Sequence, residues 1–166
     1  MKNKKQESLK RNTGAIEAQP FNYTDLLKVL LANDVDAFEI FIKNNGLNCI
    51  EKRGKTNLLM NCILENNNEF SKKLIKLGID LNYQDIKGYS ALHYAVQENN
   101  LEVVTSLIQN KADVDIFDSY GNTPLWKAAY DGKNKEIIEK LIKAGADIHK
   151  KNNSGVTPDE LLKEDS

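Results

Sequence analysis

Cysteine and histidine are scarce in this chain, and each scarcity excludes a class of protein. The two cysteines, Cys49 and Cys62, are too few for the disulfide framework of a small secreted protein, so we expect a reducing, cytoplasmic compartment. The two histidines, His93 and His149, stand far apart in the sequence. No cluster of histidine and cysteine therefore has the spacing of a metal site.

Long apolar runs and a strong net charge are also absent. No run approaches the roughly 18 apolar residues that a membrane-spanning helix needs. The N-terminal lysines are not followed by the apolar stretch of a secretory signal. A net charge of −1 provides no overall field that would attract nucleic acid or a membrane surface. We therefore expect neither of them as a partner.

The sequence motifs of common enzymes are missing as well. The chain contains no phosphate-binding G-x-x-x-x-G-K-S/T loop, no H-E-x-x-H, no G-x-S-x-G and no C-x-x-C. Five aspartates could suggest a carboxylate cluster: Asp80, Asp85, Asp113, Asp115 and Asp118. They fall at recurring turn positions, and we expect Asp85 and Asp118 to accept hydrogen bonds from the local backbone. We expect no enzyme, no catalytic residue, no cofactor and no metal.

A helix-turn-helix pattern is clearest at residues 118–151. Gly121 lies in a polar turn, Thr123 is placed to cap a helix and Pro124 falls at the first helical position. Apolar residues then recur at helical spacing in two short segments separated by a polar break. The second segment ends near Gly145, which suits a left-handed C-cap. The pattern predicts two short helices followed by an extended polar stretch.

The same pattern recurs along the chain with a period near 33 residues. Its turn glycines, which are spaced by 34, 33 and 34 residues, are Gly54, Gly88, Gly121 and Gly155. A hydroxyl residue follows each glycine by two positions, and a Leu-Ile pair recurs in the second helix of each complete copy. A fixed period of this length indicates stacked helical repeats.

These copies resemble the ankyrin repeat family, whose motif is D-x-x-G-x-T-P-L-H-x-A. The motif is spread over the copies and complete in none: residues 56–61 read TNLLMN, residues 90–95 SALHYA and residues 123–128 TPLWKA. The resemblance covers residues 22–162. It implies an all-α solenoid of stacked helix-turn-helix units with short β-hairpin-like loops. For His93 it implies an inter-repeat hydrogen bond, and we expect Trp126, at the same motif position, to pack between repeats.

The repeats divide the chain into a flexible basic tail at 1–18, an N-terminal capping repeat at 19–50, three ankyrin repeats at 51–84, 85–117 and 118–151, and a C-terminal cap at 152–166. Two residues depart from the pattern. Lys111 takes the position of the exit glycine, which calls for a left-handed backbone. Asn61 stands where the next two copies have alanine. A buried amide needs hydrogen-bond partners, so we expect irregular packing or a functional polar contact there.

Stacked repeats leave a concave surface made of hairpin tips and the outward side of each first helix. In ankyrin-like proteins this is the usual protein-binding face. Our candidates there are an apolar and aromatic group comprising Ile86, Tyr89, Tyr94, Phe117, Tyr120 and Tyr130, and a basic edge comprising Lys52, Arg53 and Lys55. Exposed aromatic side chains favour an interface. Packing between neighbouring hairpins is the alternative for the first group, and a solvated run of charges is the alternative for the second.

We expect a monomeric, non-catalytic protein that binds another protein, for example a toxin or effector enzyme. It would neutralise that partner as a small inhibitor or immunity-type protein does. An adaptor and a secreted host-directed effector are the alternatives within the same class. An enzyme subunit would instead need a polar pocket formed with the tail near Asn61, Cys62 and Cys49. Nucleic-acid binding by the tail and residues 52–55 would depend steeply on salt.

Overall fold

The computed structural model describes residues 20–132 and 134–164, and this part of the chain is largely helical. Its described helices are α2 (Tyr23–Ala32), α3 (Val35–Asn45), α4 (Leu58–Leu64), α5 (Asn68–Leu77), α6 (Ala91–Gln97), α7 (Leu101–Gln109), α8 (Pro124–Tyr130), α9 (Lys135–Lys143) and α10 (Pro158–Glu164). Two isolated β-bridges, Phe21 to Glu51 and Ile50 to Asn57, occur near the first repeat. The tail predicted at 1–18 lies outside the described residues. Within the described ranges, no helix combines the length and apolar character required to cross a bilayer.

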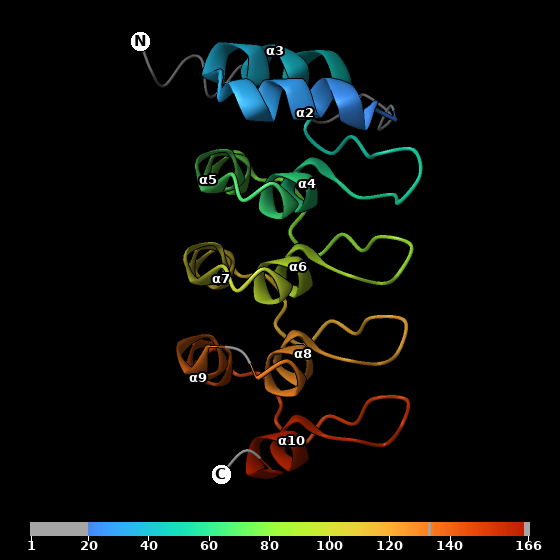
Figure 1. Cartoon of the computed structure of the whole chain (residues 1–166), viewed down its shortest axis with the longest axis vertical. Helices are drawn as coiled ribbons and strands as arrows, with labels where there is room; N and C mark the ends of the chain where they lie inside the picture. The colour runs from blue at the N-terminus through green and yellow to red at the C-terminus, as the bar shows by residue number, and fades with distance from the viewer. Residues whose placement is uncertain (1–19, 133, 165–166) are drawn as a thin grey trace. The chain divides into compact units, whose positions relative to one another are not determined.

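The chain folds as two compact units, Met1–Asp80 and Leu81–Ser166. In the second unit α6, α8 and α10 follow one another in a row, and α7 and α9 form a second row beside them (Figure 1). The hairpin loops of this unit project from the side of the first row. In the first unit α4 packs against α5, and α2 packs against α3. The predicted all-α architecture of helix-turn-helix repeats is confirmed.

Asparagine separates the two helices of a repeat. Asn66 and Asn99 adopt positive φ angles of 53° and 52°, a conformation that asparagine tolerates better than most residues. The next residues, Asn67 and Asn100, cap the second helices by accepting a backbone N–H at 3.0 and 3.1 Å. Each Asn-Asn pair therefore reverses the chain and starts the next helix. Lys111 has a φ of 67°, which confirms the left-handed backbone expected there.

The first helices of the second unit begin as the sequence predicts. Thr123 caps α8 with Pro124 in the first turn, and Ser90 and the side chain of His93 cap α6 reciprocally. In the first unit the cap of α4 moves by one residue, because Asn57 accepts the N–H of Met60 at 3.0 Å. Thr56, at the position of Thr123 and Ser90, is therefore not needed as a cap.

Each unit buries a core of its own. In the first unit, Phe38 and Phe70 are fully buried and stack with ring centroids 4.1 Å apart. In the second unit, aliphatic and alanine side chains fill the core, and the small Ala95 and Ala128 lie on α6 and α8 where these helices meet. Burying one large apolar side chain contributes about 1.5–3 kcal/mol. These cores hold the hairpins and first helices in position.

Candidate protein-binding surface

Buried aspartates shape the hairpins of the second unit. Asp85 Oδ1 accepts two backbone N–H groups of its own hairpin, at 2.8 and 2.9 Å. Asp118 Oδ1 accepts the equivalent two, both at 2.8 Å. The expectation that these two carboxylates satisfy local backbone donors is confirmed. The hairpins are therefore set by their own hydrogen bonds before any partner binds.

Neighbouring hairpins are also fastened to one another. The N–H of Ser119 donates to the carbonyl oxygen of Lys87 at 2.9 Å, and the N–H of Asn153 donates to the carbonyl oxygen of Tyr120 at 2.9 Å. Gly88 permits this approach, because a Cβ atom there would lie 2.8 Å from the backbone nitrogen of Ser119. The tips of adjacent hairpins consequently form one continuous backbone edge within this unit.

The motif histidine joins two repeats in the same region. His93 is fully buried, and its Nε2 lies 3.1 Å from the carbonyl oxygen of Asn122 in the next repeat. Its Nδ1 lies 2.9 Å from the hydroxyl of Ser90. This confirms the inter-repeat hydrogen bond that the resemblance implied. Burial lowers the pKa of His93, outweighing the hydrogen bond and the nearby aspartates, which act in the opposite direction.

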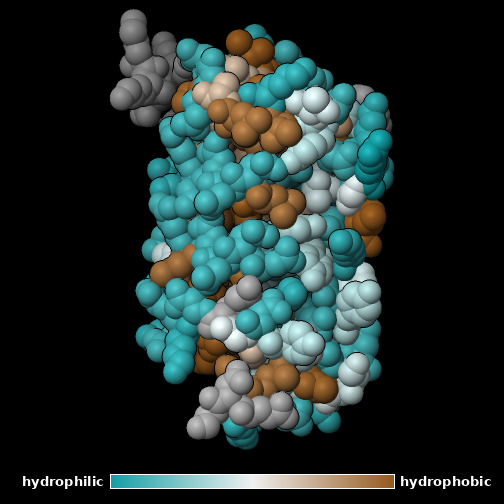
Figure 2. All heavy atoms as spheres, viewed as in Figure 1, coloured by the Kyte–Doolittle hydropathy of each residue, from teal (hydrophilic) through white to brown (hydrophobic). Residues whose placement is uncertain are grey.

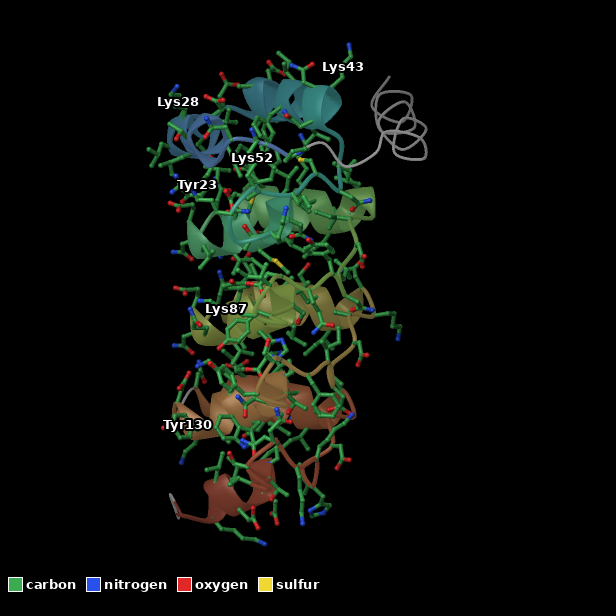
Figure 3. All side chains as sticks on the ribbon, turned by 90° about the vertical axis from the view of Figure 1, so that its right-hand side faces the viewer. Tyr23, Lys28, Lys43, Lys52, Lys87 and Tyr130 are labelled. Carbon is green, nitrogen blue, oxygen red and sulfur yellow. The ribbon has the colours of Figure 1, made fainter. Side chains whose placement is uncertain are left out.

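Three of the predicted apolar and aromatic residues are largely exposed. The exposed fractions are 65% for Ile86, 70% for Tyr120 and 65% for Tyr130. Figure 2 shows that apolar side chains form small separate patches among polar ones on the face drawn there. Figure 3 is viewed from the side on which the hairpins project. Lys87 of one hairpin and Tyr130 of α8 both lie toward the left of this view. We call Ile86, Tyr120 and Tyr130 the exposed apolar surface.

Phe117 is partly covered by its own chain. Its side chain is 42% exposed, and the Nζ of Lys150 lies over the ring at 4.6 Å from the centroid. The same ammonium group lies 3.9 Å from a carboxylate oxygen of Asp115. A cation over an aromatic face is a stabilising contact between repeats. Phe117 therefore has a packing role, and a partner would meet only its remaining surface.

Tyr89 and Tyr94 belong mainly to the interior of the hairpin. Tyr94 is buried, and its hydroxyl donates to Asp85 Oδ2 at 2.6 Å. Burial, followed by this hydrogen bond, raises the pKa of Tyr94. The ring of Tyr89 packs edge-on against that of Tyr94 at 5.4 Å and stacks on His93 at 5.2 Å. Of the two, only the half-buried Tyr89 keeps surface for a partner.

Trp126 supports the exposed ring of Tyr130. The two rings stack at 4.9 Å with an interplanar angle of 12°. Beside them on α8, Lys127 and Asp131 form an ion pair at 3.2 Å. The indole Nε1 of Trp126 is buried and has no hydrogen-bond partner among the described residues. The stack restricts the rotation of Tyr130 and so presents its ring in a fixed orientation.

The predicted basic edge lies in the first unit. Lys52, Arg53 and Lys55 are all exposed. The Glu51 carboxylate holds their hairpin by accepting the N–H groups of Arg53 and Gly54 at 2.8 and 2.6 Å. The positive φ of this turn falls on Lys55, at 57°. The structure thus groups the basic residues with one another and places them in a different unit from the aromatic residues.

Beside the basic edge lies a feature that the sequence indicated only in outline. A pocket of about 720 Å³ in the first unit is lined by Asn61, Lys52 and Arg53 among others. Cys49 and Cys62, which were expected near such a pocket, are unpaired, fully buried and absent from its lining. Burial raises the pKa of the Cys49 thiol to about 12. The departure of Asn61 from alanine was the one signal in the sequence that pointed to this place.

A sequence model of the family described as ankyrin repeats, in three copies, matches residues 59–152, which is more than half of the chain. The chain belongs to the ankyrin-repeat family. Ankyrin repeats imply a protein–protein interaction module, and the family is generally non-catalytic. The paired helices and fastened hairpins described above are the structural form of these repeats.

Relatives of this ankyrin-repeat chain occur in very different organisms. A fowlpox virus (strain NVSL) protein named as an ankyrin repeat protein is 30% identical over 156 residues, covering 90% of this chain and 43% of the relative. Serine/threonine-protein kinase 12 of Arabidopsis thaliana is 41% identical over 88 residues, covering 53% and 19%. A Rickettsia bellii (strain RML369-C) protein named as an ankyrin repeat protein is 39% identical over 80 residues, covering 45% and 47%. The chain spans less than half the length of each.

Proposed function

We propose that this ankyrin-repeat protein is a non-catalytic module that binds a partner protein through its exposed apolar surface, Ile86, Tyr120 and Tyr130. The observation that carries the proposal is the exposure of these side chains, 65–70%, on backbone that is already fixed. Water-exposed tyrosine and isoleucine side chains gain little in the free protein, whereas they bury much area in an interface. The hairpin backbone and the stacked ring beneath these side chains are already held in place. Less conformational entropy is therefore lost on binding.

The polar groups around the surface fit a rim that selects the partner. The ion pair between Lys127 and Asp131 lies next to Tyr130, and Lys87 flanks Ile86 on its hairpin. Such charges at the edge of an interface contribute more to specificity and association rate than to affinity. We infer that the partner offers an apolar patch that receives Tyr120 and Tyr130, surrounded by polar groups.

A module of this kind acts by occupying its partner, and we propose that it is a small inhibitor or immunity-type protein. Its partner would then be an enzyme, for example a toxin or effector, whose working surface is covered on binding. A cytoplasmic location belongs to this proposal and is supported by the two buried, unpaired thiols of Cys49 and Cys62. An adaptor would bind through the same surface and leave the activity of the partner unchanged.

The test compares the 166-residue chain with a triple variant of it, Ile86→Ser, Tyr120→Ala and Tyr130→Ala. Ile142→Ala is the matched control, because Ile142 is also exposed, at 41%, but lies on the second helix α9. Proteins captured by the wild type and not by the triple variant are purified, and their affinity and activity are measured. We expect the triple variant to bind at least about 100-fold more weakly, since a single interface tyrosine often contributes 2 kcal/mol or more.

Equal capture by the wild type and the triple variant would contradict the assigned surface. Loss of capture by the control variant as well would show that exposed apolar residues in general, rather than this surface, are responsible. A captured enzyme whose activity falls on binding supports the inhibitor, and one whose activity is unchanged supports the adaptor. Thermal denaturation of both variants verifies that the folded structure is retained.

A further inference from the structure

A pocket of about 720 Å³ lies in the first unit, beside α2 and α4. Tyr23 of α2 and Lys52 of the first hairpin both line it, and Figure 3 shows them on the same face of this unit. Thr56 and Asn61 contribute polar atoms to its lining, and Glu65 follows at the end of α4. Its volume is within the range of roughly 300–1,000 Å³ that is usual for ligand sites.

The pocket owes its polar lining to departures from the repeat pattern. Because Asn57 caps α4, the hydroxyl oxygen of Thr56 is left to accept the Nδ2 group of Asn61 at 3.0 Å. The same Nδ2 group also donates to the carbonyl oxygen of Asn57 at 2.7 Å. In the second unit the position of Asn61 is occupied by alanine, at Ala95 and Ala128. Only the first repeat can therefore offer a side-chain amide there.

The hydrogen bonds of Asn61 and Thr56 leave one acceptor and one donor of these two side chains unused. Asn61 is 3% exposed, and its Oδ1 accepts no hydrogen bond from the described residues. Asn61 lines the pocket, and we infer that this oxygen is the acceptor that a ligand meets there. The hydroxyl of Thr56 acts as an acceptor toward Asn61 and keeps its own proton to donate. An acceptor and a donor side by side match the N–H and C=O groups of a peptide backbone.

The charged side chains around the pocket determine which kind of peptide it can bind. Lys52 and Arg53 are exposed at the pocket and form no ion pair with a described residue. The carboxylates nearby are already engaged: Glu65 accepts the hydroxyl of Tyr23, and Glu51 accepts two backbone N–H groups. Burial, with help from Glu65, raises the pKa of Tyr23 to about 12, so its hydroxyl stays neutral at physiological pH. Glu51 and Glu65 keep their negative charges but are half-buried, so the exposed charges at the pocket are those of Lys52 and Arg53.

We propose that this pocket binds an acidic peptide segment of a partner protein in an extended conformation. The N–H of one peptide residue donates to Asn61 Oδ1 and the C=O of the same residue accepts from the Thr56 hydroxyl, while acidic side chains on either side of it meet Lys52 and Arg53. The proposal rests on the protein-binding function proposed above but uses different residues. The first 19 residues of the chain are the wrong occupant by charge, with five basic residues against two glutamates.

The test uses the 166-residue chain and a fluorescein-labelled pool of nine-residue peptides, which have glutamate at alternating positions and mixed residues between them. The comparison pool has glutamine in place of each glutamate. Fluorescence anisotropy should show binding of the glutamate pool at least about 10-fold tighter than that of the glutamine pool, and this preference should weaken as salt rises. Preference for a duplex DNA oligonucleotide over the glutamate pool would overturn the peptide assignment.

Three variants locate the binding. Lys52→Ala combined with Arg53→Ala should lower the affinity for the glutamate pool about 10-fold or more. Lys55→Ala is the matched control, because Lys55 is exposed on the same turn but does not line the pocket, and it should change the affinity less than 2-fold. Asn61→Ala introduces the residue that the next two repeats carry. The variant should therefore keep its fold while losing the side-chain oxygen that accepts the N–H of the peptide. We expect it to lower the affinity about 5-fold.

Unchanged binding by Asn61→Ala, or an equal loss with Lys55→Ala, would overturn the site. No binding of the glutamate pool at 1 mM, on the order of the weakest specific affinities, would overturn it too. These outcomes leave the exposed apolar surface untouched, since Tyr120→Ala and Tyr130→Ala should not change peptide affinity. Failure of the pocket and failure of the proposed function are thereby distinguishable.

Discussion

The two units of this protein use polar residues in different ways. In the second unit, His93, Asp85 and Asp118 are buried and engaged in hydrogen bonds that set hairpins or join repeats. In the first unit, Asn57 takes over the cap and Asn61 replaces an alanine, which leaves an amide oxygen and a hydroxyl proton beside a pocket. Where the repeat pattern is kept, polar groups stabilise the scaffold. Where it is broken, we propose that they are available to a ligand.

The exposed apolar side chains also differ between the units. In the second unit Ile86 and Tyr120 are exposed at hairpin tips and Tyr130 at the end of a first helix. Among the described residues of the first unit, the most exposed large apolar side chains are Leu31, at 75%, and Ile40, at 57%, on the helices α2 and α3. The first of these arrangements carries the proposed binding function.

The largest expected change in stability is at the turn glycines, whose surroundings differ between the two units. Gly88→Ala should destabilise the second unit by about 3 kcal/mol, because the backbone φ is +76° and the new Cβ would lie within 3.0 Å of three backbone atoms. Gly155 has a φ of +82°, but a Cβ atom there would meet nothing within 4 Å. Gly155→Ala therefore tests the backbone strain alone and should lower the free energy of unfolding by about 1 kcal/mol. Gly54→Ala, at the equivalent position of the first unit, has neither problem and should be close to neutral.

These three variants are compared by urea unfolding of the 166-residue chain. The single tryptophan, Trp126, lies in the second unit, so its fluorescence reports on that unit, while far-UV circular dichroism reports on both. A cost for Gly54→Ala equal to that for Gly88→Ala would show that the first hairpin is fastened as the others are. The structural contrast between the units would then be wrong at this position.

Much of the second unit could be predicted from the sequence. The positions of Gly121, Thr123 and Pro124 depend on local backbone rules, and the helix they predict begins at Pro124. The hydrogen bond of His93 followed from the motif. Which of the aromatic side chains are exposed could not be predicted in this way. Tyr94 is buried and Tyr120 is exposed, although both were predicted to lie on the same face. That difference depends on tertiary contacts, which one-dimensional patterns do not contain.

The first unit was harder to predict, because its decisive feature is a shift of one residue. The aligned hydroxyl of Thr56 suggested a cap like that of Thr123, but the neighbouring Asn57 is an equally good cap and takes the role. Propensity alone cannot choose between two adjacent capping residues. The hydrogen bond between Asn61 and Thr56 depends on this choice, so the sequence could mark Asn61 as unusual without giving the geometry around it.

A second prediction concerns pH, because both histidines of the chain belong to the second unit. Burial lowers the pKa of His93 in the folded protein, whereas the unfolded chain takes up a proton near pH 6.5. Below about pH 6.5 the unfolded state therefore binds more protons than the folded state, and the stability of the second unit falls as pH falls. The slope approaches about 1.4 kcal/mol per pH unit.

Hydrogen exchange measured by mass spectrometry between pH 5 and 7, corrected for the intrinsic exchange rate, resolves the two units. Protection of the second unit should fall with decreasing pH, while the first unit, whose sequence contains no histidine, should show little change. His93→Gln should be less stable at pH 7 but nearly independent of pH in this range. An unchanged pH dependence in that variant would assign the effect to another group.

The smallest expected effect is that of Asn61→Ala on stability. The substitution removes two hydrogen bonds, worth about 1 kcal/mol each, but it also removes a polar side chain that is only 3% exposed. Alanine fits the same position in the next two repeats, where Ala95 and Ala128 are fully buried. We therefore expect a change within about 1 kcal/mol in urea unfolding followed by circular dichroism. A loss above about 2 kcal/mol would mean that the amide is needed by the scaffold, and the first unit would then use its polar residues as the second does.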